Sequence, residues 1–345
     1  MASSSHHHPL PPSFTATSAP PPTPSFSSDL PSSTSSDLLS NLLHRLPPSL
    51  SLPTTRRSSP LSTTTPPAIP LSDLTPSLLP ASTEFGFFHL TDHRIPSDLP
   101  LSAESAALSL LALPRDQKQL LFPSNWPLGH EIDDDGDESL CLDSSLSDHD
   151  CFRDFASELE RLGLKVLEEL ASAVGFDNPT RNELCSLLWI SDGATKPGRI
   201  YPYAVGLHYQ ISIRKQTLLT DSGRATVSGL ADSVLVTLGD IAQVWSNGKL
   251  KKVRGRPFPC SFDENPNFDP CINMSLLITL PAESVVRPLL PNLIDDDDDD
   301  NNKGDATNKK EGEKRLFNSF SLEDYAWRIY HQPLLFKDPL LRYRA

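Results

Sequence analysis

The residue types that could carry chemistry in this sequence stand in separate short stretches. Glu131 to Asp150 contains nine Asp or Glu residues, a composition that invites a calcium site. An EF-hand loop, however, needs Asp or Asn at alternate positions, a central Gly and a terminal Glu, all between two helices. The spacing from Asp133 to Glu138 does not fit that loop, and we therefore predict a solvated acidic loop.

Histidines and arginines offer two further possibilities. His6 to His8 form a triplet that could bind a metal ion weakly, although a solvated low-complexity tract explains them more simply. Arg254 and Arg256 flank Gly255 in a basic stretch and could meet an anion. Surface arginines on a basic strand are the simpler interpretation of this pair.

The elements that must position such residues are clearest from Asp232 to Pro257. Val234, Val236 and Leu238 recur at every second position, which predicts a strand. The apolar run from Ile241 to Trp245 reads as a second strand, and Asn247-Gly248 is a strong signal for a tight hairpin turn. A third strand with a basic face follows the turn. The pattern predicts a β-hairpin system in a compact all-β core.

Two segments resemble the plant-type 2-oxoglutarate/Fe(II)-dependent dioxygenases, the isopenicillin N synthase-like superfamily. Gly239 to Arg256 (GDIAQVWSNGKLKKVRGR) is similar to the stretch that leads to their last metal-binding histidine, roughly GD-x-x-Q-x-W-S/T-N-G and then K/R-x-K-S-V-x-H-R-V. Glu84 to Pro96 (EFGFFHLTDHRIP) is similar to their N-terminal signature, in which His93 corresponds to a structural histidine. The resemblance covers about Pro66 to Tyr343.

The expected fold is mainly β with flanking helices. The resemblance implies a double-stranded β-helix (jelly roll) core with an α/β N-terminal region and a C-terminal helix. Leucines and other apolar residues at three- and four-residue spacing predict a long helix from Asp154 to Val174, and Gly175 is a natural stop for it. Frequent turn signals between Leu184 and Pro281 agree with short strands in a jelly roll.

Composition divides the chain into six predicted parts. The first is too poor in apolar residues to offset the entropy of ordering, and six consecutive aspartates, Asp295 to Asp300, should stay solvated. The parts are a disordered Ser/Pro-rich N-terminus (1–65), an N-terminal dioxygenase-like region (66–130), an acidic loop (131–150), a supporting helix with the jelly-roll core (151–290), an acidic disordered insert (291–315) and a C-terminal helical region (316–345).

The metal site of this family needs two imidazoles and one carboxylate on one face of the iron. The resemblance places the H-x-D pair at Gln210 and Ser212, and the distal histidine at Gly255. Gly206-Leu207 before the pair and Thr217 to Leu219 after it fix this register. A two-residue slip would put His208 and Gln210 in the pair and would still lack the carboxylate.

The family holds the far carboxylate of 2-oxoglutarate with an R-x-S pair, because a guanidinium can donate two parallel hydrogen bonds. Asn273 and Ser275 align with that pair, so its arginine is also replaced. Tyr203 stands where the family often has a tyrosine near the keto-acid, and a core tyrosine is an equally good interpretation. All these positions are therefore predicted to be degenerate.

Three functions follow from these losses. The favoured one is a non-catalytic protein of the dioxygenase fold that binds a small ligand or a protein partner in the old cleft and uses no cofactor. The alternative is an active oxidoreductase acting on a small plant metabolite, with Fe(II) and 2-oxoglutarate held by a site rebuilt from His208, His89 or His93. The third is an interaction protein whose acidic loops and N-terminus bind partners.

Bulk properties exclude several classes of protein. The formal net charge of -14 argues against general binding to nucleic acid or to an anionic membrane, and no apolar run is long enough to cross a bilayer. The five scattered cysteines indicate reduced thiols and neither a disulfide framework nor a zinc site. We expect a monomer in the cytoplasm, with the nucleus left open. A chloroplast location is less favoured because Asp29 and Asp37 are unusual in a transit peptide.

Overall fold

The computed structural model describes residues 63–133, 136–144, 150–192, 199–210, 214–259, 272–291, 293–294, 313–332 and 338–345, all within one compact unit, Ser59–Ala345. Ser212, nearly all of the predicted disordered N-terminus and most of the predicted acidic insert lie outside these residues. In the described part of the chain, no helix is long and apolar enough to cross a membrane.

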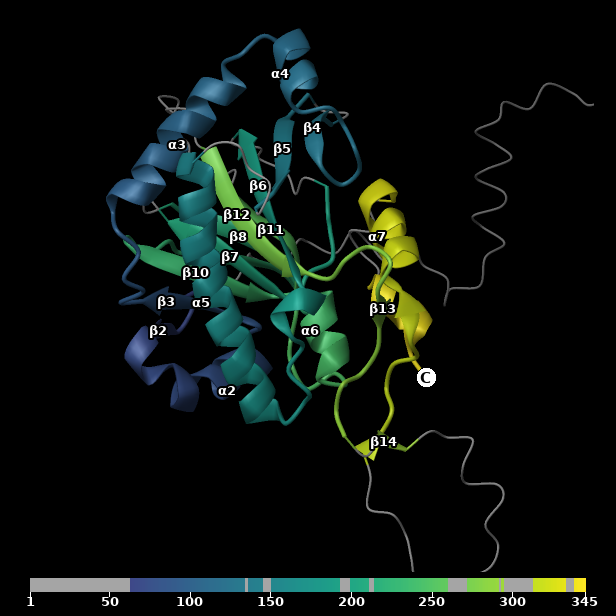
Figure 1. Ribbon diagram of the computed structural model, residues 1–345. Coiled ribbons are helices and arrows are strands. Elements are labelled where there is room, and N and C mark those ends of the chain that lie inside the picture. The colour runs from purple at the N-terminus through teal and green to yellow at the C-terminus, as the bar shows by residue number, and fades with distance from the viewer. Residues whose placement is uncertain are drawn as a thin grey trace, which may run out of the picture. The chain divides into compact units, whose positions relative to one another are not determined.

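A large sheet forms one layer of the unit (Figure 1). Its strand order is β2-β3-β10-β7-β12-β6-β5-β4, and neighbouring strands are antiparallel except for β2 and β3. The strands are β2 (Ala68–Pro70), β3 (Phe87–Thr91), β4 (Gly129–Ile132), β5 (Glu138–Asp143), β6 (Cys185–Asp192), β7 (Val205–Gln210), β10 (Ser233–Leu238) and β12 (Ile272–Thr279).

A second sheet has four strands in the order β1-β9-β8-β11. Two short strand pairs, β13 with β16 and β14 with β15, lie outside both sheets. The bounds are β1 (Thr63–Thr64), β8 (Gln216–Thr220), β9 (Gly223–Val227), β11 (Val253–Pro259), β13 (Val285–Val286), β14 (Leu293–Ile294), β15 (Glu313–Lys314) and β16 (Phe320–Ser321).

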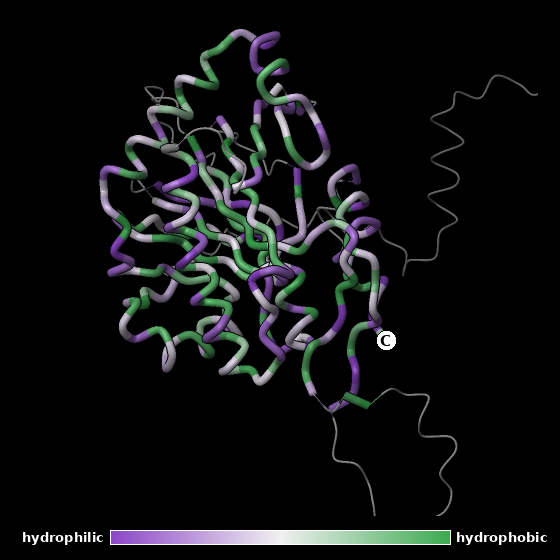
Figure 2. The backbone as a smooth tube through the Cα atoms, in the orientation of Figure 1, coloured by the Kyte–Doolittle hydropathy of each residue, from purple (hydrophilic) through white to green (hydrophobic). Residues whose placement is uncertain are grey.

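Strand β10 shows why the core is continuous through the large sheet. Side chains alternate between the two faces of a strand. Val234 and Val236 therefore join the main core cluster on the helical side, while Leu235 packs with Leu218 of β8 and Val253 of β11. Both faces of β10 are thus apolar, and the two sheets share a buried interior that we call the barrel interior. Figure 2 shows apolar residues concentrated along these central strands.

Helices cover the outer face of the large sheet. The predicted long helix is confirmed as α5 (Asp150–Val174), and Gly163 brings its backbone close to Leu207 of β7 and Ile278 of β12. Gly175, at φ +86°, ends it as expected. The other helices are α2 (Leu74–Glu84), α3 (Asp98–Leu111), α4 (Arg115–Leu121), α6 (Asp240–Trp245) and α7 (Leu322–His331), with 3-10 turns at Leu71–Asp73, Arg181–Glu183 and Pro339–Tyr343.

The predicted hairpin at Asn247-Gly248 is wrong. The apolar run before it forms α6, and the turn ends that helix, with Asn247 at φ 51° and Gly248 at φ 84°. Left-handed residues suit a helix C-terminus as well as a hairpin turn, so the same two residues were ambiguous. The Asn247 side chain also holds the C-terminal region, since its amide donates to the carbonyl of Lys314 and its oxygen accepts from the backbone N–H of Leu316.

The stretch predicted as an acidic loop also differs from expectation. Strands β4 and β5 pair within it and extend the large sheet at its edge. Buried Lys118 of α4 donates to Glu138 and to the carbonyl of Leu111, so one of the carboxylates is paired inside the fold. The many acidic side chains favoured the prediction of a loop. The stretch instead contributes to a hairpin whose two strands also carry buried residues, His130 and Leu140.

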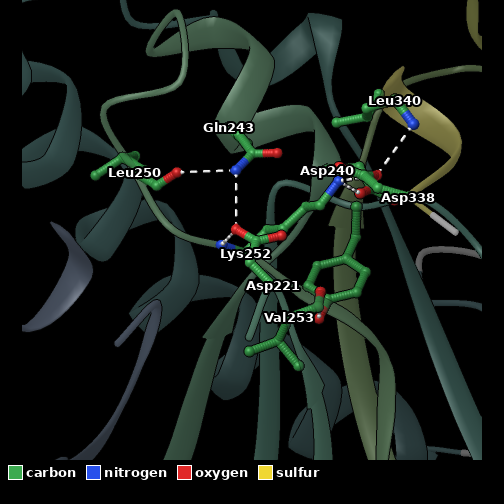
Figure 3. A network of polar contacts seen from close by, with 9 residues as sticks. Asp221, Asp240, Gln243, Leu250, Lys252, Val253, Asp338 and Leu340 are labelled. Carbon is green, nitrogen blue, oxygen red and sulfur yellow. Dashed lines mark hydrogen bonds and ion pairs between the residues drawn. The ribbon is translucent and has the colours of Figure 1, made fainter. Parts of the chain in front are cut away.

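A buried ion network fastens the C-terminal segment to α6 and β11 (Figure 3). The Nζ atom of Lys252 lies 3.0 Å from Oδ1 of Asp240 and 2.6 Å from Oδ1 of Asp338. Lys252 is fully buried and Asp240 nearly so. Although burial lowers the pKa of Lys252, the two carboxylates outweigh burial and raise it above its usual range. The network thus holds a charged lysine inside the protein.

Candidate functional site

Gly255 lies in β11 at the point where its pairing with β8 shifts register, between Arg254 and Phe258. Its φ of +68° is in the left-handed region that favours glycine. A Cβ atom at Gly255 would lie 3.2 Å from Cγ1 of Ile200. The chain that faces Gly255 is therefore the segment just before β7.

Tyr203 confirms this neighbourhood. Its hydroxyl lies 3.0 Å from the carbonyl oxygens of both Val253 and Gly255, to which it can donate. The same hydroxyl is 3.0 Å from Oγ1 of Thr237. Burial raises the pKa of Tyr203, so the phenol remains protonated and acts as a donor. Tyr203 is thus a buried tyrosine that joins the two sheets.

Gln210 is the last residue of β7. The ring of Tyr203 lies against Gly206, four residues earlier, about 13 Å along an extended strand. The flanking residues that fixed the sequence register, Leu207 and Leu218, belong to strands of different sheets, β7 and β8. The interval between them was therefore not one continuous strand, and Ser212 within it lies outside the described residues.

A polar network crosses the barrel interior beside Tyr203. Nε2 of His208 is 3.0 Å from the Thr237 hydroxyl, and its Nδ1 is 2.7 Å from Oγ of Ser275 on β12. Burial, with a smaller effect from the charge of Arg256, lowers the pKa of His208 to about 3. The imidazole is therefore neutral near pH 7, and both of its nitrogens already have partners.

The histidines proposed for a rebuilt metal site do not meet. His89 of β3 and His208 of β7 are both in register with Leu235 of β10, which lies between them. Two strand spacings place their backbones about 10 Å apart. His89 bonds to Ser228 and Ser233 instead. His93, which the resemblance treats as structural, is buried and accepts from the backbone N–H of Ile95.

A hollow opens beside Ser275 at the mouth of the barrel, and we call it the Arg256 hollow. The hollow contains about 540 Å³ of empty space, which includes open solvent, and has about 30 Å³ of room for the centres of water-sized groups. Room of that size holds about two water-sized groups. The lining residues are Glu131, Asp133, Asp137, Glu138, Ser139, Ser191, Arg199, Arg256, Pro257, Phe258, Asn273 and Ser275.

Arg256 is the distinctive group of this hollow. Its Nη1 atom is enclosed, yet none of the described residues accepts a hydrogen bond from it. Its guanidinium carbon stands 4.2 Å from the centroid of the Trp189 ring, a cation–π contact that fixes its place. Burial lowers the pKa of Arg256 to about 10, so the group is still a cation near pH 7. An enclosed cationic donor without an acceptor is costly, and an anion would relieve the cost.

The remaining charged groups surround Tyr330 and the β4–β5 hairpin. Arg199 donates to the carbonyl of Tyr330 at 3.4 Å and stands 5.7 Å from the centroid of its ring, while the Tyr330 hydroxyl donates to Glu131. Burial raises the pKa of Glu138, but the hydrogen bond and charge of Lys118, with His130, hold that pKa below its usual range. The Glu138 carboxylate is thus ionised, and these contacts hold both carboxylates in place.

Sequence reasoning placed some of this site and missed the rest. Asn273 and Ser275, predicted beside the keto-acid, do line the hollow. Arg256 was noted only as a flanking arginine on a basic strand. Arg199 carried no local signal, and Glu131 stood in the acidic stretch that was predicted to be a solvated loop, because each acquires its place through Tyr330.

Solved structures of 2-oxoglutarate/Fe(II) oxygenases are similar to this one. That of JOX2 in complex with 2OG, Fe and JA has a TM-score of 0.62 at 16% sequence identity, over 82% of this chain and 90% of that chain. The rice dioxygenase for auxin oxidation reaches 0.59 at 18% identity, over 81% and 99% of the two chains. A putative 2OG-Fe(II) oxygenase family protein from Caulobacter crescentus reaches 0.57 at 14% identity, over 76% and 97%.

No family model and no curated protein matches the sequence. The solved structures alone show that the chain has the 2-oxoglutarate/Fe(II) oxygenase fold. The predicted jelly-roll class and the resemblance behind it are thereby confirmed at the level of the fold.

The prediction that no cofactor takes part is overturned by the same comparisons. The JOX2 structure contains both Fe and 2OG, and the other two proteins are named as a dioxygenase and an oxygenase. The fold therefore points to iron and 2-oxoglutarate, in contrast to the expectation from the replaced ligands.

The described residues suit a carboxylate such as those of 2-oxoglutarate better than they suit iron. Within the described ranges, no three His, Cys, Asp or Glu side chains come together in a way that could hold a metal ion. His208 in the barrel interior has both nitrogens engaged. Iron therefore finds no ligand set in this part of the chain. A carboxylate such as those of 2-oxoglutarate fits better, because the Nη1 atom of Arg256 is an enclosed donor that needs an acceptor.

Proposed function

We propose that this protein is a non-catalytic binding protein of the 2-oxoglutarate/Fe(II) dioxygenase fold, and that it holds a small carboxylate in the Arg256 hollow. The single observation that carries the proposal is the enclosed Nη1 atom of Arg256, which has no acceptor among the described residues. A bound carboxylate would supply the missing acceptor through a charge-assisted hydrogen bond.

Neighbouring groups support this role for Arg256. Arg199 lines the same hollow and is anchored on Tyr330. Ser275 and Asn273 add neutral polar groups on β12. Such a site binds by two guanidinium groups and a few polar side chains, and 2-oxoglutarate, the keto-acid to which the fold points, belongs to the class of ligand that would suit it.

The alternative function is an active oxidoreductase that uses iron and 2-oxoglutarate on a small metabolite. The observation in its favour is the fold, shared with structures such as JOX2 in complex with 2OG and Fe. Against it stands His208, whose two nitrogens bond to Thr237 and Ser275 and whose burial keeps it neutral without a metal. A protein-binding function has no comparable observation behind it.

Titration calorimetry of the full chain with 2-oxoglutarate and with succinate tests the proposal. We expect binding of at least one acid, weakened by at least about tenfold in Arg256→Gln and less in Arg256→Lys, which keeps the charge. Arg224→Gln is the matched control, since Arg224 is exposed on β9 outside the hollow. Failure of 2-oxoglutarate, succinate and L-glutamate alike to bind would contradict the carboxylate site.

Iron analysis and assay of succinate release from 2-oxoglutarate on the same preparation distinguish the alternative. We expect no succinate above background, because the described residues supply no iron ligands. Stoichiometric iron together with succinate release would establish the oxidoreductase and overturn the non-catalytic proposal.

A further inference from the structure

The Arg256 hollow carries two kinds of charge from separate elements. The acidic residues Glu131, Asp133, Asp137 and Glu138 all come from the β4–β5 hairpin and its turn. The two arginines come from β11 and from the segment before β7. Such a division of charge is a pattern that a ligand of mixed charge can match.

Tyr330 of α7 brings the opposite charges close to each other. Its hydroxyl donates to Glu131, while its ring lies 5.7 Å from the guanidinium carbon of Arg199. One aromatic ring thus separates a carboxylate from a guanidinium. The two groups do not pair with each other, and each is held by contacts to Tyr330.

A ligand with negative charge alone would suit only part of this hollow. Lys118 neutralises Glu138, whereas the hydrogen-bond partner of Glu131 is the neutral Tyr330 hydroxyl. Glu131 would repel a second anionic group of the ligand, and an ammonium group there would be attracted instead. The hollow has about 30 Å³ of room for the centres of water-sized groups, which suits a compact head group, and the rest of a ligand would extend into open solvent.

We propose that the ligand of the Arg256 hollow is a free α-amino acid, bound with its carboxylate at Arg256 and its ammonium group toward Glu131. The inference rests on the proposed carboxylate site and names the class of its ligand. The ammonium group would donate to Glu131, while the side chain of the amino acid points out of the hollow toward solvent.

Matched pairs of acids test the inference on the full chain. L-glutamate and 2-oxoglutarate share one carbon skeleton, as do L-alanine and pyruvate, and within each pair an ammonium group replaces the keto oxygen. Calorimetry should show that the amino acid of at least one pair binds at least about tenfold more tightly than its keto-acid. Equal or tighter binding of the keto-acid in both pairs would overturn the inference and leave the carboxylate site standing.

The variant Glu131→Gln separates charge from structure. The glutamine can still accept from the Tyr330 hydroxyl, so the fold should be kept, while the attraction for an ammonium group is lost. We expect amino-acid binding to weaken about tenfold or more with little change for the keto-acid. Glu104→Gln on α3, outside the hollow, is the control. An unchanged preference in Glu131→Gln would overturn the inference, and no binding by any of the four acids would overturn both proposals.

Discussion

Gly255 and Arg256 are neighbours in β11 and have different roles: the first acts through its backbone and the second through its side chain. Gly255 has a left-handed backbone and its carbonyl accepts from Tyr203. Arg256 lines the hollow with its guanidinium over the ring of Trp189, and its Nη1 atom is enclosed. At Gly255, the position that the sequence resemblance predicts for the distal histidine, this chain thus has a structural hydrogen bond and, one residue later, a donor suited to an anion.

The buried neutral histidine of the barrel interior predicts a pH dependence of stability. His208 has a pKa of about 3 in the folded protein, against 6.5 as its ordinary value. The unfolded chain therefore binds a proton that the folded chain does not, so the stability is full above about pH 6.5 and falls as the pH drops toward 3. Between pH 7 and pH 5 this group alone should lower the free energy of unfolding by about 2 kcal/mol.

Urea denaturation of wild type and His208→Gln at pH 7 and pH 5 measures the effect. The variant should lose about 2 kcal/mol of the pH dependence, while exposed His331→Gln should keep it. A pH dependence that is the same in His208→Gln and wild type would show that His208 does not stay neutral in the folded state.

At the scale of elements, close approaches at glycines fix how the helices meet the sheets. Gly239 begins α6, and a Cβ atom there would lie 2.1 Å from the backbone carbonyl oxygen of Tyr203. Gly163 of α5 is crowded as well, but by the ends of the Leu207 and Ile278 side chains, at 2.6 and 2.4 Å. Side-chain ends can rotate away, whereas a backbone carbonyl inside the fold cannot.

Alanine at these two glycines should therefore lower the free energy of unfolding by unequal amounts. Gly239→Ala should lower the free energy of unfolding by about 3 kcal/mol or more, because the α6–β7 contact must open. Gly163→Ala should cost less, since about 1 kcal/mol of helix propensity offsets part of the crowding. Urea denaturation of both variants gives the comparison, and a larger cost at Gly163 would contradict it.

Across the whole molecule, the sequence predicted what depends on periodic apolar residues. The long helix α5 and strand β10 lay where the spacing of apolar residues placed them, and the family segments pointed to the jelly roll that the solved structures confirm. The six-residue helix α6 was mistaken for a strand because a short apolar run fits either element. The register from Gly206 to Leu219 spans two sheets, which no local pattern reveals, and the degenerate positions Gln210, Ser212 and Gly255 stay predictions.

The C-terminal segment depends on one buried lysine, which gives a prediction for the stability of the whole unit. Lys252→Met would leave Asp240 buried without its cation and would release Asp338. The free energy of unfolding should fall by about 3–5 kcal/mol, as for other buried pairs that lose one partner. Exposed Lys251→Met should stay within about 0.5 kcal/mol of wild type in the same urea titration. Equal stability of the two variants would mean that the network is not a point of attachment.

The backbone of Gly255 limits which residues this position can accept. A histidine at φ +68° would adopt a conformation that costs L-residues about 1–2 kcal/mol, and its Cβ atom would press on Ile200. A single Gly255→His substitution would therefore lower the stability of the fold. An imidazole at this position requires that β11 and the Ile200 segment change together, and a change of one codon does not supply both.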